Sequence, residues 1–238
     1  MSDNNDNSMP ETPPRSQVLV GIPCYTGEVA AETVNGLLNS INLFHGISWG
    51  IGCCHIGIAR DNIVSEFLNG GWNKLVFIDT DIVFTPQQFQ RIISYNMPVV
   101  AGVYKTRSVD GDLTLCPWKS GPVPEHRELA HVRRAATGFM AIQRSVFTTI
   151  QERFPERAYK SKMGPRYNFF PAALIHDPNS NEMVVQTDDY GFCDLVNSAG
   201  LSVHVDLGVC VGHKGHAIYQ VNLPAIEPKT EPGEPCCA

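Results

Sequence analysis

The sequence predicts one α/β domain, built on a mostly parallel sheet with helices on both faces and followed by a more irregular half. With 238 residues and 43% hydrophobic content, the chain is long enough to bury one substantial core. Strand-like segments alternate with segments of helical periodicity, an order typical of a parallel sheet covered by helices. The alternation is less regular in the second half of the chain.

The first half contains the clearest strands and helices. A β-rich run over residues 17–22 ends at Pro23, and continuous apolar runs over 74–78 and 99–103 indicate buried strands. Two groups of apolar residues have helical spacing: Val34, Leu37, Leu38 and Ile41, then Ile63, Val64, Phe67 and Leu68. The second of these helices is expected to stop at Gly70.

A third helix and the irregular half follow. Thr85 and Pro86 form a cap and first-turn pair, and the helix that they open would bury Phe89, Ile92 and Ile93. Residues 136–143 are strand-like, Ser145 begins a short helix, and residues 155–186 form a long, partly hairpin-like excursion. Thr187 caps a helix that stops at Gly200, and residues 201–205 return as a strand.

Polar, proline-rich ends flank this domain. Residues 1–16 and 221–238 hold too little apolar surface to offset the entropy of ordering, so we expect disordered tails around one domain over 17–220. No run reaches the roughly 18–20 apolar residues of a membrane span, and the start lacks the basic-then-apolar order of a secretory signal. The expected location is therefore cytoplasmic, which means the host cytoplasm if the protein is viral.

The eight cysteines are expected to be reduced, mostly buried thiols. A zinc site is disfavoured because no pair has C-x-x-C spacing, and Cys210 with His213 has no partner pair.

Charge is unevenly distributed along the chain. The net charge is −6, yet the stretch from Lys105 to Arg166 holds 12 of the 18 Lys and Arg residues and 6 of the 24 acids, so it carries about +6. Two interpretations follow: the middle of the chain binds an anionic acceptor, such as a modified nucleic acid or a charged glycan, or it is a solvated basic surface and the acceptor is neutral.

Asp79-Thr80-Asp81 is the most informative motif. It follows the buried run 74–78, and ligands of open α/β sheets bind outside the carboxyl ends of the strands. Carboxylates two residues apart project to the same side of an extended backbone, so both can bind one hard cation. A Mg²⁺ or Mn²⁺ ion held there would neutralise the diphosphate of a nucleotide-sugar. The alternative is a solvated turn with acids near a helix start.

Several motifs in order carry a family resemblance. They are Gly21–Tyr25, Ala59–Asn62, Phe77–Asp81, Thr137–Phe147, Asp188–Cys193 and Val211–His213. In this order they resemble the GT-A glycosyltransferase superfamily, in particular compact family-two-like enzymes of bacteria, phages and large DNA viruses. The resemblance implies a metal-dependent transfer of a sugar from a nucleotide-sugar to an acceptor hydroxyl. It also implies a nucleotide-sugar half over residues 17–105 and an acceptor half over 106–220.

The resemblance also implies roles for individual residues on the donor side. Pro23, Tyr25 and Thr26 would form the loop that holds the nucleoside, and Arg60 would contact the base or a phosphate, for which its planar fork is suited. The alternative for Arg60 is an ion pair at the helix start, for example with Asp61. Asp79, Thr80 and Asp81 would hold the metal-bound diphosphate. His213 would complete the metal site with Asp79 and Asp81, with His216 as a nearby substitute, and a neutral imidazole suits Mn²⁺ better than Mg²⁺.

On the acceptor side the resemblance implies a pair of catalytic acids. Asp189 takes the place of the general base of inverting members, and Asp188 stands where the family usually has Glu, so the division of labour between the two stays open. Both also occupy the first turn of a helix, where the dipole favours acids in any protein. Trp118 is either a core residue or a stacking platform for a sugar.

Two other functions are weighed against glycosyl transfer. A nucleotidyltransferase that makes nucleotide-sugars would need a glycine-rich, lysine-bearing loop where this chain has Pro-Cys-Tyr-Thr-Gly. A catalytically inert nucleotide- or glycan-binding module would not need the intact acids and histidine, and donor hydrolysis with added Mn²⁺ discriminates it. The sugar, the base, the acceptor, the stereochemistry and the oligomeric state are not specified by the sequence.

Overall fold

The computed structural model describes residues 17–107, 111–116, 129–162, 164–177 and 182–221. Its centre is a seven-stranded sheet in the order β2-β1-β3-β9-β5-β14-β7. The strands are, in chain order, β1 Val18–Cys24, β2 Gly46–Ile51, β3 Lys74–Ile78, β5 Val99–Val103, β7 Leu129–Val132, β9 Phe139–Gln143 and β14 Val203–Cys210. Only β9 and β7 run against the other strands of this sheet, so the predicted, mostly parallel α/β architecture is confirmed.

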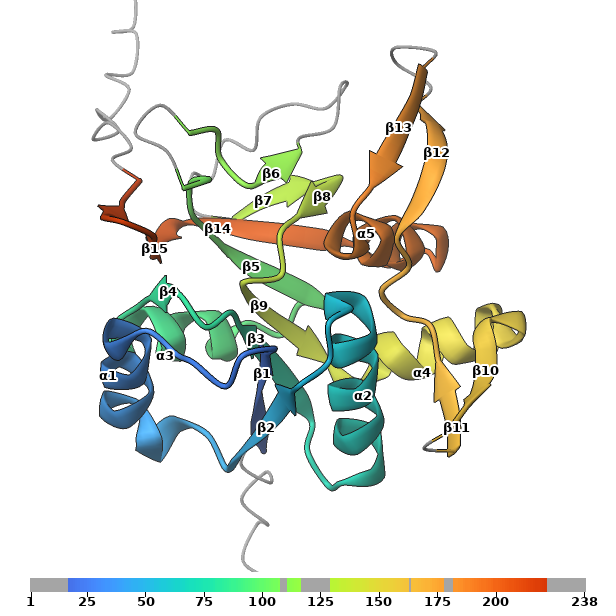
Figure 1. Cartoon of the computed structure of the whole chain (residues 1–238), viewed down its shortest axis with the longest axis horizontal. Coiled ribbons are helices and arrows are strands. Elements are labelled where there is room, and N and C mark those ends of the chain that lie inside the picture. The colour runs from blue at the N-terminus through green and yellow to red at the C-terminus, as the bar shows by residue number, and fades with distance from the viewer. Residues whose placement is uncertain (1–16, 108–110, 117–128, 163, 178–181, 222–238) are drawn as a thin grey trace, which may run out of the picture.

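Helices cover both faces of the sheet. The described helices are α1 Ala31–Asn39, α2 Ile56–Asn69, α3 Pro86–Ser94, α4 Arg144–Arg153 and α5 Asp188–Ser198, with 3-10 turns η1 Ile41–Leu43 and η2 Pro155–Arg157. Figure 1 shows α1 and α3 on one face and α2, α4 and α5 on the other. The buried strand β3 contributes side chains to the hydrophobic cores on both faces of the sheet. Leu75 and Phe77 belong to one core, and Val76 and Ile78 belong to the other.

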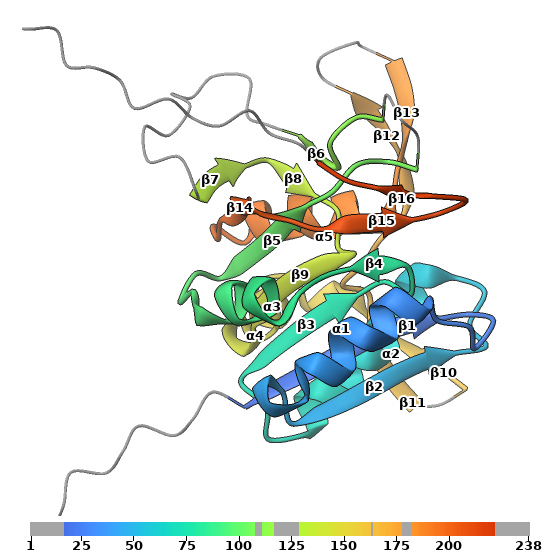
Figure 2. The same cartoon turned by 90° about the vertical axis from the view of Figure 1, so that its left-hand side faces the viewer.

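Short strands surround one edge of this frame. They are β4 Ile82–Val83, β6 Leu115–Cys116, β8 Arg134–Ala135, β10 Ala158–Ser161, β11 Gly164–Tyr167, β12 Ala173–Asp177, β13 Glu182–Gln186, β15 Gly212–Lys214 and β16 Ile218–Tyr219. The excursion predicted over 155–186 contains two hairpins, β10–β11 and β12–β13, and the second projects from the body (Figures 1 and 2). A separate sheet in the order β16-β15-β4 lies beside the end of β3.

Several local predictions are confirmed. β3 and β5 have the predicted bounds, and α2 ends at Asn69, directly before Gly70. Thr85 caps α3 in a reciprocal capping box, because its hydroxyl accepts from the Gln88 N–H at 3.3 Å and the Gln88 side chain accepts from the Thr85 N–H at 2.8 Å. Gly200 follows α5 with a φ of 75°, the left-handed conformation expected after a helix.

Other local predictions need correction. The helical spacing in the segment 34–41 does not mark a buried face, because Leu37 is buried whereas Val34, Leu38 and Ile41 are 37%, 62% and 53% exposed. Strand β2 was not predicted. It contains two glycines and lies at the edge of the sheet, so its sequence lacks the alternation of apolar and polar residues that indicates a strand. Strand β1 runs through Pro23, which lies opposite Gly50 in the sheet and not in the following loop.

The six cysteines in the described part of the chain are free thiols, as predicted, but four of them are not buried. Of the six in the described part of the chain, Cys24 and Cys193 are buried and the others are partly or fully exposed. No described helix is both long enough and apolar enough to cross a membrane. The two predicted tails lie outside the described residues except for Val221, which is buried in the core and so belongs to the domain.

Candidate active site

The aspartates of the D-x-D motif follow β3 directly, at the carboxyl end of the sheet. The Asp79 N–H donates to the Gly138 carbonyl at 3.0 Å, and the Thr80 carbonyl accepts from the Ala30 N–H at 2.8 Å and from the Thr33 hydroxyl at 3.1 Å. These bonds fix the backbone of the motif between α1 and β9. The two carboxylates, however, have different partners.

Arg60 connects Asp79 to the acids of α5. Its guanidinium donates to Asp79 Oδ1 at 3.1 Å and forms an ion pair with Asp188, although these three residues are far apart in sequence. The Arg60 side chain is only 4% exposed, so it is held inside the protein by two carboxylates and not by Asp61 as the alternative interpretation had it. The structure therefore brings the D-x-D motif and the start of α5 to one point.

Asp81 faces a different set of groups. Its carboxylate forms an ion pair with Arg107, and its Oδ2 lies 3.4 Å from Nε2 of His213. His213 is brought there because β15 pairs with β4, with His213 opposite Ile82. The Lys214 N–H also donates to the Asp81 carbonyl at 2.7 Å. His216 is exposed in the turn that joins β15 to β16.

The His213 ring is oriented like a metal ligand. Its Nδ1 lies 2.8 Å from the Lys105 carbonyl, and its Nε2 accepts from Arg107 Nε at 3.2 Å, so the proton is on Nδ1. Burial, with Arg107 nearby, lowers the pKa of His213, which keeps the ring neutral at pH 7. A histidine whose second nitrogen donates to a backbone carbonyl is the usual arrangement at metal sites, and here the Nε2 lone pair accepts from Arg107 beside Asp81.

The predicted metal ligands Asp79, Asp81 and His213 fit a divalent ion only in part. Asp81 and His213 converge, whereas Asp79 is turned to Arg60, and no three His, Cys, Asp or Glu side chains in the described residues are grouped closely enough to hold a metal. The predicted trio of ligands is thus not preassembled. Two protein ligands suffice for an ion that takes its other ligands from diphosphate oxygens, as Mg²⁺ does at phosphate sites.

The two acids of α5 are separated by their contacts. Asp188 binds Arg60, while the Asp189 carboxylate accepts from the Thr187 hydroxyl and from the Tyr190 N–H, the latter at 2.9 Å. Thr187 occupies the predicted capping position, but its hydroxyl binds this carboxylate and no backbone N–H of the helix. Burial raises the pKa of Asp189 above the ordinary range of an aspartate, although the Thr187 hydroxyl and Arg60 oppose this.

Gly138 and Tyr104 support the motif from behind. The Tyr104 hydroxyl accepts from the Gly138 N–H at 3.0 Å, and a Cβ on Gly138 would lie 2.4 Å from that hydroxyl and 3.0 Å from Asp79 Oδ2. A side chain at position 138 would therefore displace both groups. Tyr104, Lys105 and Arg107 were not predicted as site residues, although they follow β5 just as Asp79 follows β3, and the same strand-end rule would have found them.

The remaining predicted residues are placed as follows. Tyr25 is 62% exposed and Thr26 is exposed in the loop after β1, whereas Pro23 is buried within that strand. Two arginines of the basic stretch share a partner inside the protein: Arg134 forms an ion pair with Asp194, and Arg133 Nε lies 3.6 Å from the same carboxylate. Trp118 lies outside the described residues.

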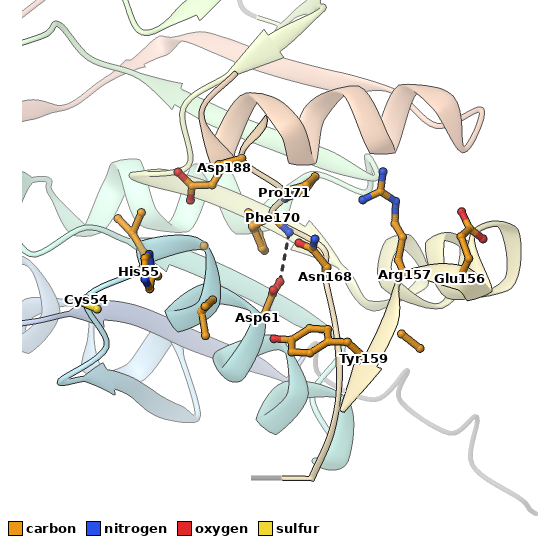
Figure 3. Close-up of a pocket in the computed structure, with 15 residues that line it drawn as sticks. Cys54, His55, Asp61, Glu156, Arg157, Tyr159, Asn168, Phe170, Pro171 and Asp188 are labelled. Atoms are coloured by element: carbon orange, nitrogen blue, oxygen red, sulfur yellow. Dashed lines mark hydrogen bonds between the residues drawn. The ribbon is translucent and has the colours of Figure 1, made fainter. Parts of the chain in front are cut away.

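Asp61, next to Arg60, is a buried acid within the motif Ala59–Asn62 for which the sequence predicted no role beyond an ion pair with Arg60. Its Oδ1 accepts from the N–H groups of Phe169 and Phe170 at 2.9 and 3.2 Å, as the dashed line in Figure 3 shows for Phe170. Burial raises the pKa of Asp61 to about 7, and nearby Asp188 adds to this, while the two N–H groups oppose it. Asp61 therefore holds a proton in the folded protein at a pH where it is ionised in the unfolded chain.

This proton makes stability depend on pH. The folded state binds more protons between the unfolded pKa near 4 and the folded pKa of about 7, so the free energy of unfolding falls as pH rises through that window, by up to about 1.4 kcal/mol per pH unit. Asp61→Asn keeps the oxygen that accepts both N–H groups and cannot ionise. We expect the variant to gain stability relative to the parent as pH rises from 5 to 8 in urea denaturation at each pH. A constant difference between the two across this range would contradict the assignment.

Comparisons with known proteins identify the fold. No family model and no curated protein sequence matches the chain. Among solved structures, A197 from STIV aligns with a TM-score of 0.55 at 15% identity, over 90% of this chain and 99% of its own. The fold is GT-A-like.

Two further solved structures align less closely. Glucosyl-3-phosphoglycerate synthase from Mycobacterium tuberculosis, in complex with Mn²⁺, UDP-glucose and phosphoglyceric acid, aligns at 13% identity over 57% of this chain and 59% of its own, with a TM-score of 0.37. S. aureus TarS 1–349 aligns at 10% identity over 85% of this chain and 59% of its own, with a TM-score of 0.41. At such identities the likeness concerns the fold alone.

Proposed function

We propose that the protein is a metal-dependent glycosyltransferase that moves a sugar from a nucleotide-sugar to an acceptor hydroxyl. The observation that carries this proposal is the ion-pair bridge through Arg60, which brings Asp79 and Asp188 to one buried point. A D-x-D motif and a pair of acids at a helix start are each common, but glycosyl transfer needs both in one place. The donor diphosphate is held by the first and the acceptor hydroxyl is activated by the second.

The donor side is proposed to lie over the ends of β1 and β3. Tyr25 and Thr26 are exposed beside the motif and are available to the nucleoside, while Asp81 and His213 would hold a divalent ion. A bound Mn²⁺ or Mg²⁺ ion supplies neutralisation of the diphosphate as it leaves. Arg60 is already used by two carboxylates, so we assign it to positioning Asp79 and Asp188 and not to contact with the nucleotide.

On the acceptor side, Asp189 is proposed as the general base. Its carboxylate is oriented by the Thr187 hydroxyl and the Tyr190 N–H, and it is not committed to an ion pair with Arg60 as Asp188 is. A raised pKa makes a carboxylate a stronger base when it is ionised, which suits the removal of a proton from a hydroxyl. The proton would pass to Asp189 as the hydroxyl oxygen bonds to the anomeric carbon and the diphosphate departs.

Thermal-shift screening of nucleotide-sugars with Mn²⁺ or Mg²⁺ tests the proposal. A ligand that binds only the folded state raises the melting temperature according to its concentration relative to its dissociation constant. We expect one nucleotide-sugar to stabilise the protein in the presence of metal, and slow hydrolysis of that donor to follow. Absence of any metal-dependent shift across donors of all common bases would contradict the proposal.

Arg107 occupies the position beside Asp81 where the ion would lie. Its guanidinium contacts both Asp81 and His213, and its side chain is 58% exposed. An exposed ion pair of this kind is worth about 0.2–1 kcal/mol, so Arg107→Ala should tighten Mn²⁺ binding by about 1.5- to 5-fold, measured by electron paramagnetic resonance of free Mn²⁺. Weaker Mn²⁺ binding in this variant would show that Arg107 does not compete for the site.

A further inference from the structure

A cavity of about 810 Å³ lies beside Asp61 and Asp188, the second of which is an ion-pair partner of Arg60. It is bounded by the start of α2 on one side and by η2, β10 and the segment 168–172 on the other, and it reaches the first residue of α5 at Asp188 (Figure 3). Its volume is within the range of about 300–1,000 Å³ typical of small-molecule sites. None of the roles proposed above for the donor uses this cavity.

The wall of the cavity is held by two close backbone approaches. A Cβ on Gly57 of α2 would lie 2.6 Å from the Phe170 carbonyl oxygen, and one on Gly191 of α5 would lie 1.9 Å from the Pro171 carbonyl oxygen. Only glycine permits these approaches, so the segment 168–172 is clamped between the two helices. Phe170 is fixed further by stacking on Phe192, with ring centroids 4.6 Å apart. The cavity is therefore a built feature of the fold.

Its polar groups are suited to hydroxyls. Asp61 lies at the floor, where its Oδ1 takes both backbone N–H groups, and the described residues provide no hydrogen-bond donor to its Oδ2. Figure 3 shows the Tyr159 hydroxyl turned toward Asp61, with Asn168 beside them. These carboxylate, phenol and amide groups can accept hydrogen bonds from a ligand's hydroxyls and donate to them.

The apolar groups and the charges narrow the ligand class. Ile56 and Ile58 are 45% and 43% exposed and offer an apolar surface to C–H groups. Asp61, Glu156 and Asp188 all line the cavity, and Arg157 is the one Lys or Arg among its described lining residues. The positive charge of Arg60 is already matched by Asp79 and Asp188. An anionic group placed at the floor of the cavity would therefore find no unmatched positive charge to bind it.

We propose that this cavity binds a neutral, polyhydroxylated part of the acceptor, such as a sugar unit adjacent to the reacting hydroxyl. The inference rests on the proposed glycosyl transfer, and it places the acceptor next to Asp188, the neighbour of Asp189 in the first turn of α5. It selects the neutral acceptor over the anionic one that the basic stretch 105–166 had left open. Of that stretch, Arg157 lines the cavity, whereas Arg133 and Arg134 contact Asp194 and do not line it.

A cavity-filling variant with a matched control tests this proposal. Ala172 is exposed and lines the cavity, whereas its neighbour Ala173 is exposed and does not, so Ala172→Trp fills the space and Ala173→Trp adds the same side chain outside it. The probes are the methyl glycosides of glucose, galactose, mannose and N-acetylglucosamine, and glucose 6-phosphate as the anionic counterpart. Saturation-transfer-difference NMR on the full chain measures binding without any need for turnover.

We expect at least one methyl glycoside to bind the parent protein and Ala173→Trp alike, and to bind Ala172→Trp at least about tenfold more weakly, a loss of about 1.4 kcal/mol. Tyr159→Phe, which keeps the ring, should weaken the same glycoside by about two- to tenfold through the loss of one hydrogen bond. Preference for glucose 6-phosphate, no binding of any glycoside, or equal binding in both Trp variants would overturn the proposal. Failure of the nucleotide-sugar screen would instead contradict the proposed function, because the NMR measurement contains no donor.

Discussion

Replacing Asp189 by asparagine is expected to slow sugar transfer by a factor of about 100 or more, the usual scale for the loss of a general base. Affinity for the nucleotide-sugar should stay nearly unchanged, because the Asp189 carboxylate contacts Thr187 and Tyr190 and not the D-x-D motif. Single-turnover transfer and donor titration, performed separately, measure the two effects. Glu182→Gln, which removes an exposed carboxylate on β13, is the matched control.

The pH dependence of transfer provides a second readout for Asp189. Burial raises its pKa, so the ionised base accumulates only as pH rises above the ordinary range of an aspartate, and the transfer rate should rise with it. This rise should disappear in Asp189→Asn. Loss of donor affinity in the variant, with the pH profile preserved, would assign Asp189 to the donor site.

Asp81→Ala is expected to remove most turnover and the metal dependence of donor binding. Asp81 and His213 are the two convergent groups of the proposed metal site, so removal of the carboxylate should cost more than the roughly 10–100-fold typical of losing a second-shell partner. The fold should persist, because the motif is held by backbone bonds of Asp79 and Thr80. Asp112→Ala removes an exposed carboxylate outside the proposed metal site and serves as the control. Turnover in Asp81→Ala equal to that of the control would contradict the role of Asp81.

The order of the buried strands and helices could be predicted because their signals are local. The run 74–78 is apolar at every position but Lys74, and Thr85 with Gln88 forms a capping box that can be read from four residues. Strand β2 escaped prediction because it lies at the sheet edge, where its glycines and exposed Trp49 and Ile51 show no buried alternation. The prediction of a buried helix face was wrong for Val34, Leu38 and Ile41, which have the spacing of such a face but are exposed.

The candidate site was only partly predictable from the sequence. The acids of the D-x-D motif and of α5 follow strand and helix signals, but their meeting at Arg60 depends on contacts across 19 and 128 positions of the chain. Asp79 was predicted to bind metal beside Asp81, yet the buried charge of Arg60 draws its carboxylate away. The burial of Asp61 and the adjacent cavity gave no sequence signal, because both arise from the packing of the segment 168–172 between two helices.

In the proposed mechanism, a divalent ion on Asp81 and His213 mediates donor binding. Isothermal titration of the nucleotide-sugar that gives the largest thermal shift, in Mn²⁺ and then in EDTA, tests it most directly. We predict that removal of the metal weakens donor binding by at least about tenfold, or 1.4 kcal/mol, and that added Mn²⁺ restores it. Equal donor affinity in EDTA and in Mn²⁺ would contradict the claim.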